Sequence, residues 1–458
     1  MALTQDRTLN HILSETTRDR LFPQHLELVP QLNEVYELEL AYLESRILDD
    51  DEIIRNGAYF ARVGDRLTRH FLMCSGESVL LPQNSSSRLR SFFQTNQFKT
   101  GYGTHGLFPY RGKFHPQMIK GLMNVMGLKP GEAVLDPMMG SGTVLIEASL
   151  MGINSFGVDT SPFCRFMTQA KLDGLKVPLE PLREAQRKSR IVFDHFCQVA
   201  GAPRRGSKKR AWAQSGDLLE LMESGVEYVG GRSGMTSLPR ELRAPNLSNF
   251  LLLAYLDSAG YSERSSRATP YDQFRAILDR YVFVAEKVQR VIRGLEEELG
   301  VGEAIEGDAR ELPFSDESVD GIIFSPPYSF AIDYLENDSF HLRFMGVDVD
   351  DLRQKMIGLR GDRARSRVEL YRQDMERVMS ECARVLRRGR ICTVVVGTNN
   401  NQLAKVMGVA PSEVEGIDDM HVTLSGQYGL SLVRRIVRQI TGMANVMRNE
   451  SILMFTRS

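Results

Sequence analysis

A short apolar segment, residues 131–135, runs directly into the glycine-rich turn 136–143 and then into a helical pattern. Gly140 and Gly142 lack the Cβ atom that would keep a ligand away from the backbone. A strand, a glycine-rich turn and a helix form the arrangement that holds a nucleotide-like cofactor at the carboxyl edge of a parallel sheet. The turn is neither G-x-G-x-x-G nor a P-loop, which disfavours a dinucleotide or ATP phosphate site. The segment therefore predicts an α/β fold with a cofactor site at the sheet edge.

Later strands also end in acidic residues. Asp159 lies at the tip of the next expected strand, where a carboxylate can accept hydrogen bonds from ribose hydroxyls. It could also cap the following helix. Asp308 follows another short strand, and residues 391–397 and 451–455 read as further strands. Repeated strand–helix units predict a parallel α/β sheet.

The apolar run 319–324 reads as a buried strand that ends at Ser325-Pro326-Pro327-Tyr328. Proline fixes φ and has no backbone donor, so the carbonyls of this corner are left as acceptors. Acceptors beside a flat ring suit a flat substrate with an NH2 group. The alternative is a proline-rich turn that only ends a strand.

Composition bounds the class of protein. The 458 residues allow more than one domain, and a net charge of -1 leaves nucleic-acid contact to local patches. Five cysteines without a C-x-x-C pair indicate neither a disulfide framework nor a metal site, which fits a reducing cytosol. We see no signal-peptide pattern and no apolar run that could cross a bilayer, so we expect a cytoplasmic protein without membrane contact.

Basic segments supply the candidate polyanion contacts. One lies at residues 204–210 near Trp212, and another at residues 360–367 follows the proline corner. Solvated loops or helix starts are the competing interpretation of such charge runs. The candidate nucleic-acid-binding residues are Arg204, Arg205, Lys208, Lys209, Arg210, Arg363, Arg365 and Arg367.

In this order, the motifs resemble the amino-methyltransferases of nucleic acids that use S-adenosylmethionine (AdoMet). The matching pieces are residues 114–117, 136–143, Asp159, 307–309 and 325–328, and the resemblance covers roughly residues 105–175 and 300–458. It implies a doubly wound, mostly parallel, Rossmann-like methyltransferase sheet. The expected organisation is a helical N-terminal region (1–100), a methyltransferase domain (101–175 and 271–458) and an insertion (176–270) as the candidate target-recognition region.

The resemblance also assigns roles. Asp159 would hold the ribose hydroxyls and Asp308 the adenine amino group of AdoMet. Ser325 and the Pro326 carbonyl would accept hydrogen bonds from the exocyclic amine of the substrate, and Tyr328 would stack on the target base. The implied cofactor-binding residues are Phe114, His115, Asp136, Pro137, Met138, Gly140, Ser141, Gly142, Thr143, Asp159, Asp308 and Ala309. The implied catalytic residues are Ser325, Pro326, Pro327 and Tyr328.

Members of this group with Ser at the first motif position mostly methylate cytosine N4, whereas Asp or Asn accompanies adenine N6, or guanine N2 in tRNA. The chain is therefore expected to be a cytosine-N4-specific DNA methyltransferase that binds DNA. The alternatives are an adenine-N6 DNA methyltransferase, a tRNA guanine-N2 methyltransferase acting on RNA, and an inactive AdoMet-binding partner subunit. The resemblance allows a restriction endonuclease as a partner, and the sequence does not indicate an oligomeric state. Met138-Met139 stands where an aromatic residue is common, and the insertion is long.

Overall fold

The structure is a computed structural model. It describes residues 15–30, 32, 34–75, 101–110, 112–199, 238–239, 242–264, 268–293, 298–327, 334–361, 363–398, 400–439 and 449–458. Tyr328 and the basic cluster 204–210 with Trp212 lie outside the described residues.

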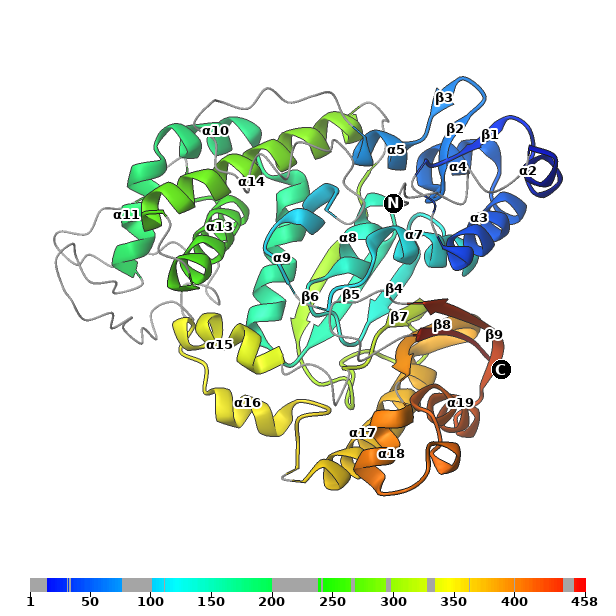
Figure 1. Cartoon of the computed structure of the whole chain (residues 1–458). Coiled ribbons are helices and arrows are strands. Elements are labelled where there is room, and N and C mark those ends of the chain that lie inside the picture. The colour runs from blue at the N-terminus through cyan, green and yellow to red at the C-terminus, as the bar shows by residue number, and fades with distance from the viewer. Residues whose placement is uncertain are drawn as a thin grey trace, which may run out of the picture.

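Seven strands form the central sheet in the spatial order β6-β5-β4-β7-β8-β10-β9 (Figure 1). The five strands β4 to β8 pair in parallel, and β10 is antiparallel to both of its neighbours. Among the parallel strands, chain order runs outward in both directions from β4, which makes the carboxyl ends of β4 and its neighbours a topological switch point. The bounds are β4 (Ala133–Asp136), β5 (Asn154–Asp159), β6 (Gly302–Glu306), β7 (Val319–Phe324), β8 (Leu386–Thr398), β9 (Leu430–Gln439) and β10 (Asn449–Arg457).

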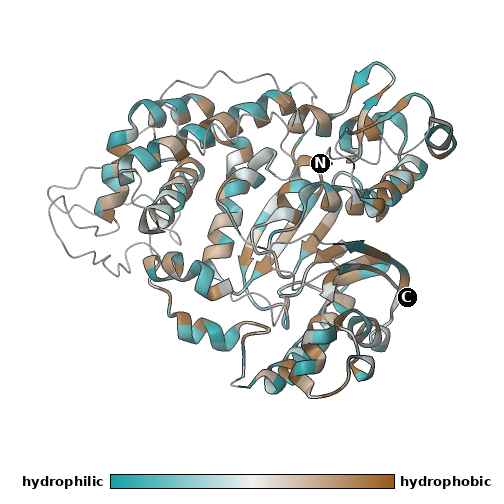
Figure 2. Cartoon of the chain, viewed as in Figure 1, coloured by the Kyte–Doolittle hydropathy of each residue, from teal (hydrophilic) through white to brown (hydrophobic). Residues whose placement is uncertain are grey.

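The sheet separates two hydrophobic cores. Neighbouring residues of one strand enter opposite cores: Val134 packs into one and Leu135 into the other. Helices α7 (Pro116–Val125), α8 (Thr143–Leu150) and α9 (Pro162–Lys176) contribute to the first core, and α17 (Ala364–Val385) and α19 (Ile417–Gln427) contribute to the second. Strands buried on both faces are nearly continuously apolar, and Figure 2 shows this as brown central strands between mixed helices. The predicted doubly wound fold is confirmed.

The N-terminal region contains a small sheet as well as helices. Its strands pair in the antiparallel order β1-β2-β3. The expectation of a mainly helical region was therefore incomplete. The acidic run 49–52 lies at the start of a helix, where Asp49 is the N-cap and accepts a hydrogen bond from the Glu52 backbone at 2.8 Å. The elements are α2 (Glu15–Leu21), β1 (Leu26–Leu28), α3 (Val35–Ile47), α4 (Asp50–Asn56), β2 (Phe60–Val63), β3 (Arg66–Leu67) and α5 (Arg69–Cys74).

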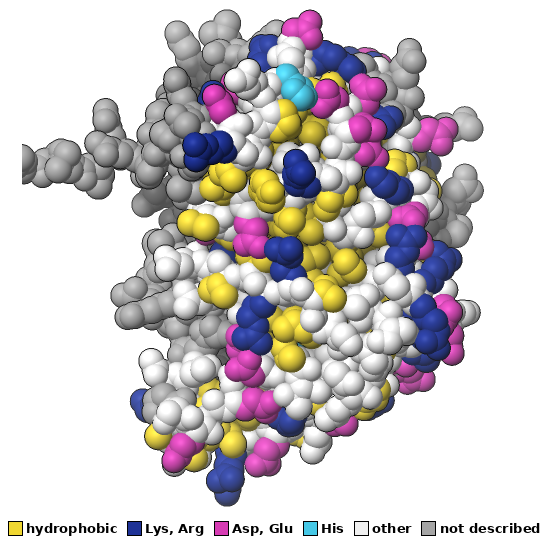
Figure 3. Space-filling view, turned by 90° about the vertical axis from the view of Figure 1, so that its right-hand side faces the viewer, with side chains coloured by type: hydrophobic (Ala, Val, Ile, Leu, Met, Phe, Trp, Pro, Cys, Tyr) yellow, Lys and Arg dark blue, Asp and Glu magenta, His cyan; other side chains and the backbone are white. Residues whose placement is uncertain are grey.

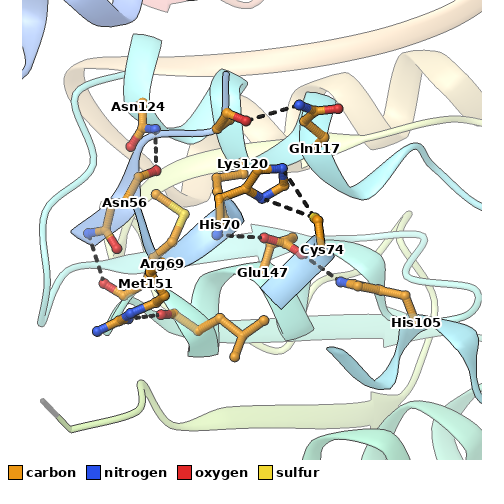
Figure 4. A network of polar contacts seen from close by, with 12 residues as sticks. Asn56, Arg69, His70, Cys74, His105, Gln117, Lys120, Asn124, Glu147 and Met151 are labelled. Carbon is orange, nitrogen blue, oxygen red and sulfur yellow. Dashed lines mark hydrogen bonds and ion pairs between the residues drawn. The ribbon is translucent and has the colours of Figure 1, made fainter. Parts of the chain in front are cut away.

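Buried polar contacts attach this region to α7 and α8 (Figure 4). The Asn124 amide of α7 donates to Glu44 of α3 at 2.6 Å and to the Asn56 carbonyl at 2.8 Å. Arg69 of α5 donates to the Leu150 carbonyl at the end of α8. Because α7 and α8 start beside the glycine-rich turn, the N-terminal region helps to fix the sheet edge where that turn lies.

Glu147 of α8 is the centre of the most buried charged contacts in this network. His105 donates to its carboxylate at 2.6 Å and Lys120 pairs with it at 3.5 Å, and none of the three side chains is more than 2% exposed. Burial alone would raise the pKa of Glu147, but the Lys120 charge and the His105 hydrogen bond outweigh it and lower the pKa to about 2. Glu147 is therefore ionised in the folded protein.

We expect Glu147→Gln to lower the free energy of unfolding by about 3–5 kcal/mol, because it leaves the Lys120 charge buried without its partner. Chemical denaturation measures the change. The matched control is Glu52→Gln, which breaks an ion pair of 2.6 Å between partly exposed side chains and should cost less than about 1 kcal/mol. Equal losses in the two variants would contradict this role of Glu147.

The segment between β5 and β6 is helical where it is described. It comprises α9, α10 (Leu179–Arg187), α11 (Ser189–Val199), α13 (Pro245–Arg264) and α14 (Pro270–Arg293). Cations on these helices face carboxylates: Arg183 lies 2.7 Å from Glu286 and Arg190 lies 3.1 Å from Asp194. These pairs reduce the positive charge that the helices could offer to a polyanion.

The remaining described elements follow β7 or precede α7. They are the 3-10 turn η1 (Gly103–Gly106), α15 (Tyr334–Phe344), α16 (Val349–Lys355), α18 (Asn400–Met407) and the 3-10 turn η3 (Pro411–Glu413). None of the helices in the described ranges combines the length and the apolar character that a membrane span requires.

Strand β9 is the edge of the sheet, on the side of the molecule that Figure 3 views. Hydrophobic side chains there lie among charged ones, and Val433 and Val437 of β9 are more than half exposed. Arg434 and Arg435 of this strand pair with Glu39 and Asp419 at 2.9 and 2.8 Å, and a register shift interrupts its pairing with β10. Charges and irregular pairing are the usual protection of an edge strand.

Candidate functional site

A cleft lies at the carboxyl ends of β4, β5, β6 and β7 and contains about 950 Å³ of empty space, including the part open to solvent. Residues after each of these strands line it, as expected for a topological switch point. The lining residues are Tyr110, Gly112, Lys113, Phe114, Asp136, Pro137, Met138, Met139, Gly140, Ser141, Thr143, Asp159, Thr160, Ser161, Cys164, Gly307, Asp308, Ala309, Ser325, Pro327, Leu335, Asp338, Met356 and Ile357.

Asp159 connects the turn after β4 to the turn after β5. One of its carboxylate oxygens accepts a hydrogen bond from the Gly140 backbone at 3.0 Å, and the other accepts one from the Ser161 backbone at 2.8 Å. Ser161, rather than Asp159, is the N-cap of α9, so the alternative role as a helix cap was wrong. Each oxygen of Asp159 retains a lone pair for a further donor.

Side chains of α9 hold the glycine-rich turn from behind. Thr168 donates to the Gly140 carbonyl at 3.1 Å, and the buried Lys171 donates to the Ser141 carbonyl at 3.3 Å. Gly142 has a φ of +76°, and a Cβ atom there would lie 2.7 Å from the Thr168 hydroxyl. Glycine at this position is therefore required both by the backbone conformation and by close packing.

The cleft is strongly acidic. Burial raises the pKa of Asp159 to about 6 and that of Asp136 well above its ordinary value. Lys113 is the only lysine or arginine among the described lining residues, and burial lowers its pKa to about 8. Its ammonium group donates to the His105 carbonyl at 3.0 Å.

Asp308 lies in the cleft, but its carboxylate is already engaged. Arg310 donates to both of its oxygens, at 2.9 and 2.6 Å, and also to Asp374. Although burial opposes the change, the Arg310 hydrogen bonds lower the pKa of Asp308. Any ligand that donates to Asp308 therefore shares this carboxylate with Arg310.

The cleft brings together ten of the twelve residues predicted to bind a cofactor, leaving out His115 and Gly142. Ser325 and Pro327 line it beyond the end of β7, whereas Pro326 is buried behind them. Arg363 and Arg365 are exposed at the start of α17, six to eight residues beyond Ile357 of the cleft wall.

Several lining residues were missed by the sequence analysis. Tyr110 and Lys113 lie next to the motif at residues 114–117, so their proximity to it was a usable signal. Asp338 and Ile357 carry no local pattern that marks them.

The chemistry of the lining fits AdoMet. Carboxylates can accept from the ribose hydroxyls and balance a sulfonium or ammonium charge, and Lys113 is a cation for a carboxylate. Met138, Leu335 and Ile357 give an apolar surface for a flat heterocycle. This set of acceptors, one cation and an apolar wall would hold the amino acid, ribose and adenine parts of the cofactor.

Comparison with known proteins also indicates an AdoMet-dependent methyltransferase. Residues 107–200 match the UPF0020 family model, described as an RMKL-like methyltransferase domain. This part of the chain is thus a methyltransferase domain, and the resemblance to AdoMet-dependent nucleic-acid methyltransferases is confirmed at that level. AdoMet is the cofactor of this class of fold.

Relatives over parts of the chain are nucleic-acid methyltransferases. Type II methyltransferase M.MjaII of Methanocaldococcus jannaschii is 44% identical over 96 residues, which are 20% of this chain and 18% of the relative. Type II methyltransferase M.BsoBI of Geobacillus stearothermophilus is 23% identical over 294 residues, 55% of this chain and 54% of the relative. A tRNA (guanine(10)-N2)-dimethyltransferase of Methanothermobacter thermautotrophicus is 42% identical over 52 residues, 11% of this chain and 16% of the relative. The chain thus spans about half the length of these relatives or less.

Solved structures are similar only weakly. A SAM-dependent methyltransferase of Methanosarcina mazei aligns over 72% of this chain and 94% of its own, at 11% identity and a TM-score of 0.31. The doubly wound fold is defined by the sheet topology itself.

The raised pKa of Asp159 predicts that AdoMet binds more tightly as the pH rises from about 5 to 7.5. Ribose hydroxyls are bound best by the ionised carboxylate, so binding lowers this pKa and releases a proton. Each pH unit below the pKa of the free protein should weaken binding by up to about tenfold. Calorimetric titration at several pH values measures how the AdoMet affinity depends on pH. In Asp159→Asn, the change in affinity centred near pH 6 should be absent. A flat profile in the unsubstituted protein would contradict the prediction.

Proposed function

We propose that this protein is a DNA methyltransferase that transfers a methyl group from AdoMet to the exocyclic N4 amine of cytosine. The observation that carries the proposal is that Ser325 and Pro327 share one cleft with Asp136, Gly140 and Asp159. The methyl donor and the amine acceptor would thus meet at one sheet edge. Serine at the first motif position supports cytosine N4, and the relatives named as Type II methyltransferases support DNA as the substrate.

The residues of the chain would act by orientation. An aromatic exocyclic amine is a weak nucleophile because its lone pair is delocalised into the ring. The Ser325 hydroxyl and the Pro326 carbonyl would accept hydrogen bonds from the two N–H groups of the amine. These bonds would favour a pyramidal nitrogen with its lone pair directed at the methyl carbon. AdoMet supplies that methyl group when bound, and Tyr328 would replace the stacking that a flipped base loses.

The test is to incubate the protein with AdoMet labelled in its methyl group and duplex DNA, and then to digest the DNA to nucleosides. The expected product is N4-methylcytosine. Label in N6-methyladenine, or in RNA alone, would overturn the base assignment while leaving the methyltransferase class intact.

A tRNA guanine-N2 methyltransferase is the second candidate, favoured by the 42% identity to the tRNA relative over 52 residues. Adding bulk tRNA to the same assay separates the two. Label in N2-methylguanine and none in DNA would establish this second function.

The insertion 176–270 and the start of α17 are the proposed contacts with nucleic acid. Arg363 and Arg365 are exposed at the N-terminus of α17, where the helix dipole also favours an anion. Arg365 lies 3.5 Å from Glu369, but both side chains are more than half exposed, so this pair competes little with a phosphate.

We expect the double variant Arg363→Ala, Arg365→Ala to bind DNA more weakly and to lower the salt slope of binding by about 2. The control is Arg434→Ala, Arg435→Ala on β9, outside both proposed contact regions, where the two cations already pair with Glu39 and Asp419. Fluorescence anisotropy at several salt concentrations measures both. An unchanged slope in the α17 variant would exclude these residues as phosphate contacts.

A further inference from the structure

Helix α15 carries a carboxylate into the cleft that no motif predicted. Asp338 is 7% exposed and lines the cleft together with Asp159. Tyr110 lines the same cleft. The Tyr110 hydroxyl also lies 3.5 Å from the Cys164 sulfur at the start of α9.

Packing of neighbouring side chains holds α15 in this place. His341, one turn after Asp338, stacks on Phe163 of α9 with ring centroids 4.7 Å apart and meets Phe108 edge to face at 4.9 Å. The position of Asp338 is thus set by the same helix, α9, that supports the glycine-rich turn.

Asp338 adds to an uneven balance of charge. The described lining of the cleft contains Asp136, Asp159, Asp308 and Asp338 but only Lys113 as a cation. Arg310 neutralises Asp308. Where they are ionised, the other three carboxylates attract a cationic ligand and repel an anionic one, and they discriminate little for or against a neutral ligand.

We propose that Asp338 is an additional cofactor-binding residue, whose carboxylate makes the cleft select the cationic AdoMet over its neutral product, S-adenosylhomocysteine (AdoHcy). AdoMet carries a sulfonium and an ammonium charge against one carboxylate, whereas AdoHcy has lost the sulfonium charge. The two ligands otherwise share the ribose, the adenine and the amino acid group. A contact with any shared group affects both affinities alike, whereas an added negative charge favours AdoMet alone.

The selection has a consequence for turnover. Transfer of the methyl group removes the positive charge that the ionised Asp338 stabilises, so the product state is bound less tightly than the substrate state. Burial and the nearby Asp159 raise the pKa of Asp338 to about 7, so a bound cation would favour the ionised form of this carboxyl.

The test is calorimetric titration of Asp338→Asn with AdoMet and with AdoHcy, without nucleic acid. We expect the AdoMet dissociation constant to rise about tenfold or more and the AdoHcy constant to change less than about threefold. Sinefungin, which carries an amino group in place of the methylated sulfonium, should follow AdoMet. Asparagine resembles the neutral acid in size, so we expect the variant to fold, and its melting temperature checks this.

Two variants serve as matched controls. Glu336→Gln removes the same charge from an exposed position of α15 and should leave both affinities within about twofold, because water screens it. Asp338→Glu keeps the charge and should retain most of the preference for AdoMet. Equal losses for AdoMet and AdoHcy in Asp338→Asn, or no loss for either, would overturn the proposal.

This inference rests on AdoMet as the cofactor but not on the base that is methylated. The titration contains no nucleic acid, so a wrong base assignment leaves its outcome unchanged. Conversely, if Asp338→Asn leaves the ratio of the AdoMet and AdoHcy dissociation constants unchanged, Asp338 does not have this role, and the labelling result is unaffected.

Discussion

Ser325→Ala is expected to lower the turnover number for methyl transfer by about a hundredfold to a thousandfold, with AdoMet affinity within about twofold. The variant removes one of the two acceptors proposed for the amine, and these act on the transition state rather than on the cofactor. Ser325 lies beyond the end of β7, while the glycine-rich turn follows β4. Single-turnover kinetics with labelled AdoMet, together with a cofactor titration, separates the two effects.

The matched control is Ser318→Ala in the turn before β7, where the serine hydroxyl donates to the Ser315 carbonyl at 2.6 Å. It should retain turnover within about twofold. If Ser325→Ala retains a third or more of the activity, the hydroxyl is not a catalytic acceptor, and the proline corner acts by shape alone.

Gly142→Ala should weaken AdoMet binding by at least about tenfold and lower the free energy of unfolding by about 2–5 kcal/mol. Two costs combine: the φ of +76° is strained for alanine, and the new Cβ atom overlaps the Thr168 side chain. Since Thr168 holds the Gly140 carbonyl, relief of the overlap shifts the turn that lines the cleft. Cofactor titration and chemical denaturation measure the two losses.

Gly131→Ala provides the comparison, because Gly131 has a φ of +85° but nothing lies within 4 Å of its added Cβ atom. It should lose about 1–2 kcal/mol of stability through strain alone and keep its AdoMet affinity. Adding Thr168→Ala to Gly142→Ala should recover part of the loss, which is a non-additive effect between contacting residues. Identical cofactor affinities in the two glycine variants would exclude the packing explanation.

The sequence predicted the features that depend on short stretches of chain. A glycine-rich turn between a strand and a helix needs residues that tolerate positive φ and close approach: Gly140 and Gly142 both have positive φ, and Gly142 also packs closely against Thr168. The proline corner after β7 is also determined locally, because two consecutive prolines fix the backbone there. The carboxyl ends of neighbouring parallel strands meet at one edge, so the positions of Asp136 and Asp159 followed from the parallel sheet that the repeated strand–helix pattern predicted.

Contacts between distant segments could not be predicted from short stretches of sequence. The strands β1 to β3 are two to four residues long, too short for a clear alternating pattern, so the N-terminal sheet was missed. The Arg310 contact with Asp374 joins positions 64 residues apart and follows only from the packing of α17. In the sequence, nothing distinguishes Asp338 from any other acidic residue of a helix. It reaches the cleft only because α15 packs against α9.

The sequence by itself therefore determined the class of fold, the glycine-rich turn and the proline corner, because backbone conformation and the alternation of strands with helices are encoded in local residue types. Only the tertiary structure decided the charge of the cleft, because that charge depends on which carboxylates are buried together and which are paired. Asp308 is paired by Arg310, whereas Asp159 and Asp338 line the same cleft with raised pKa values.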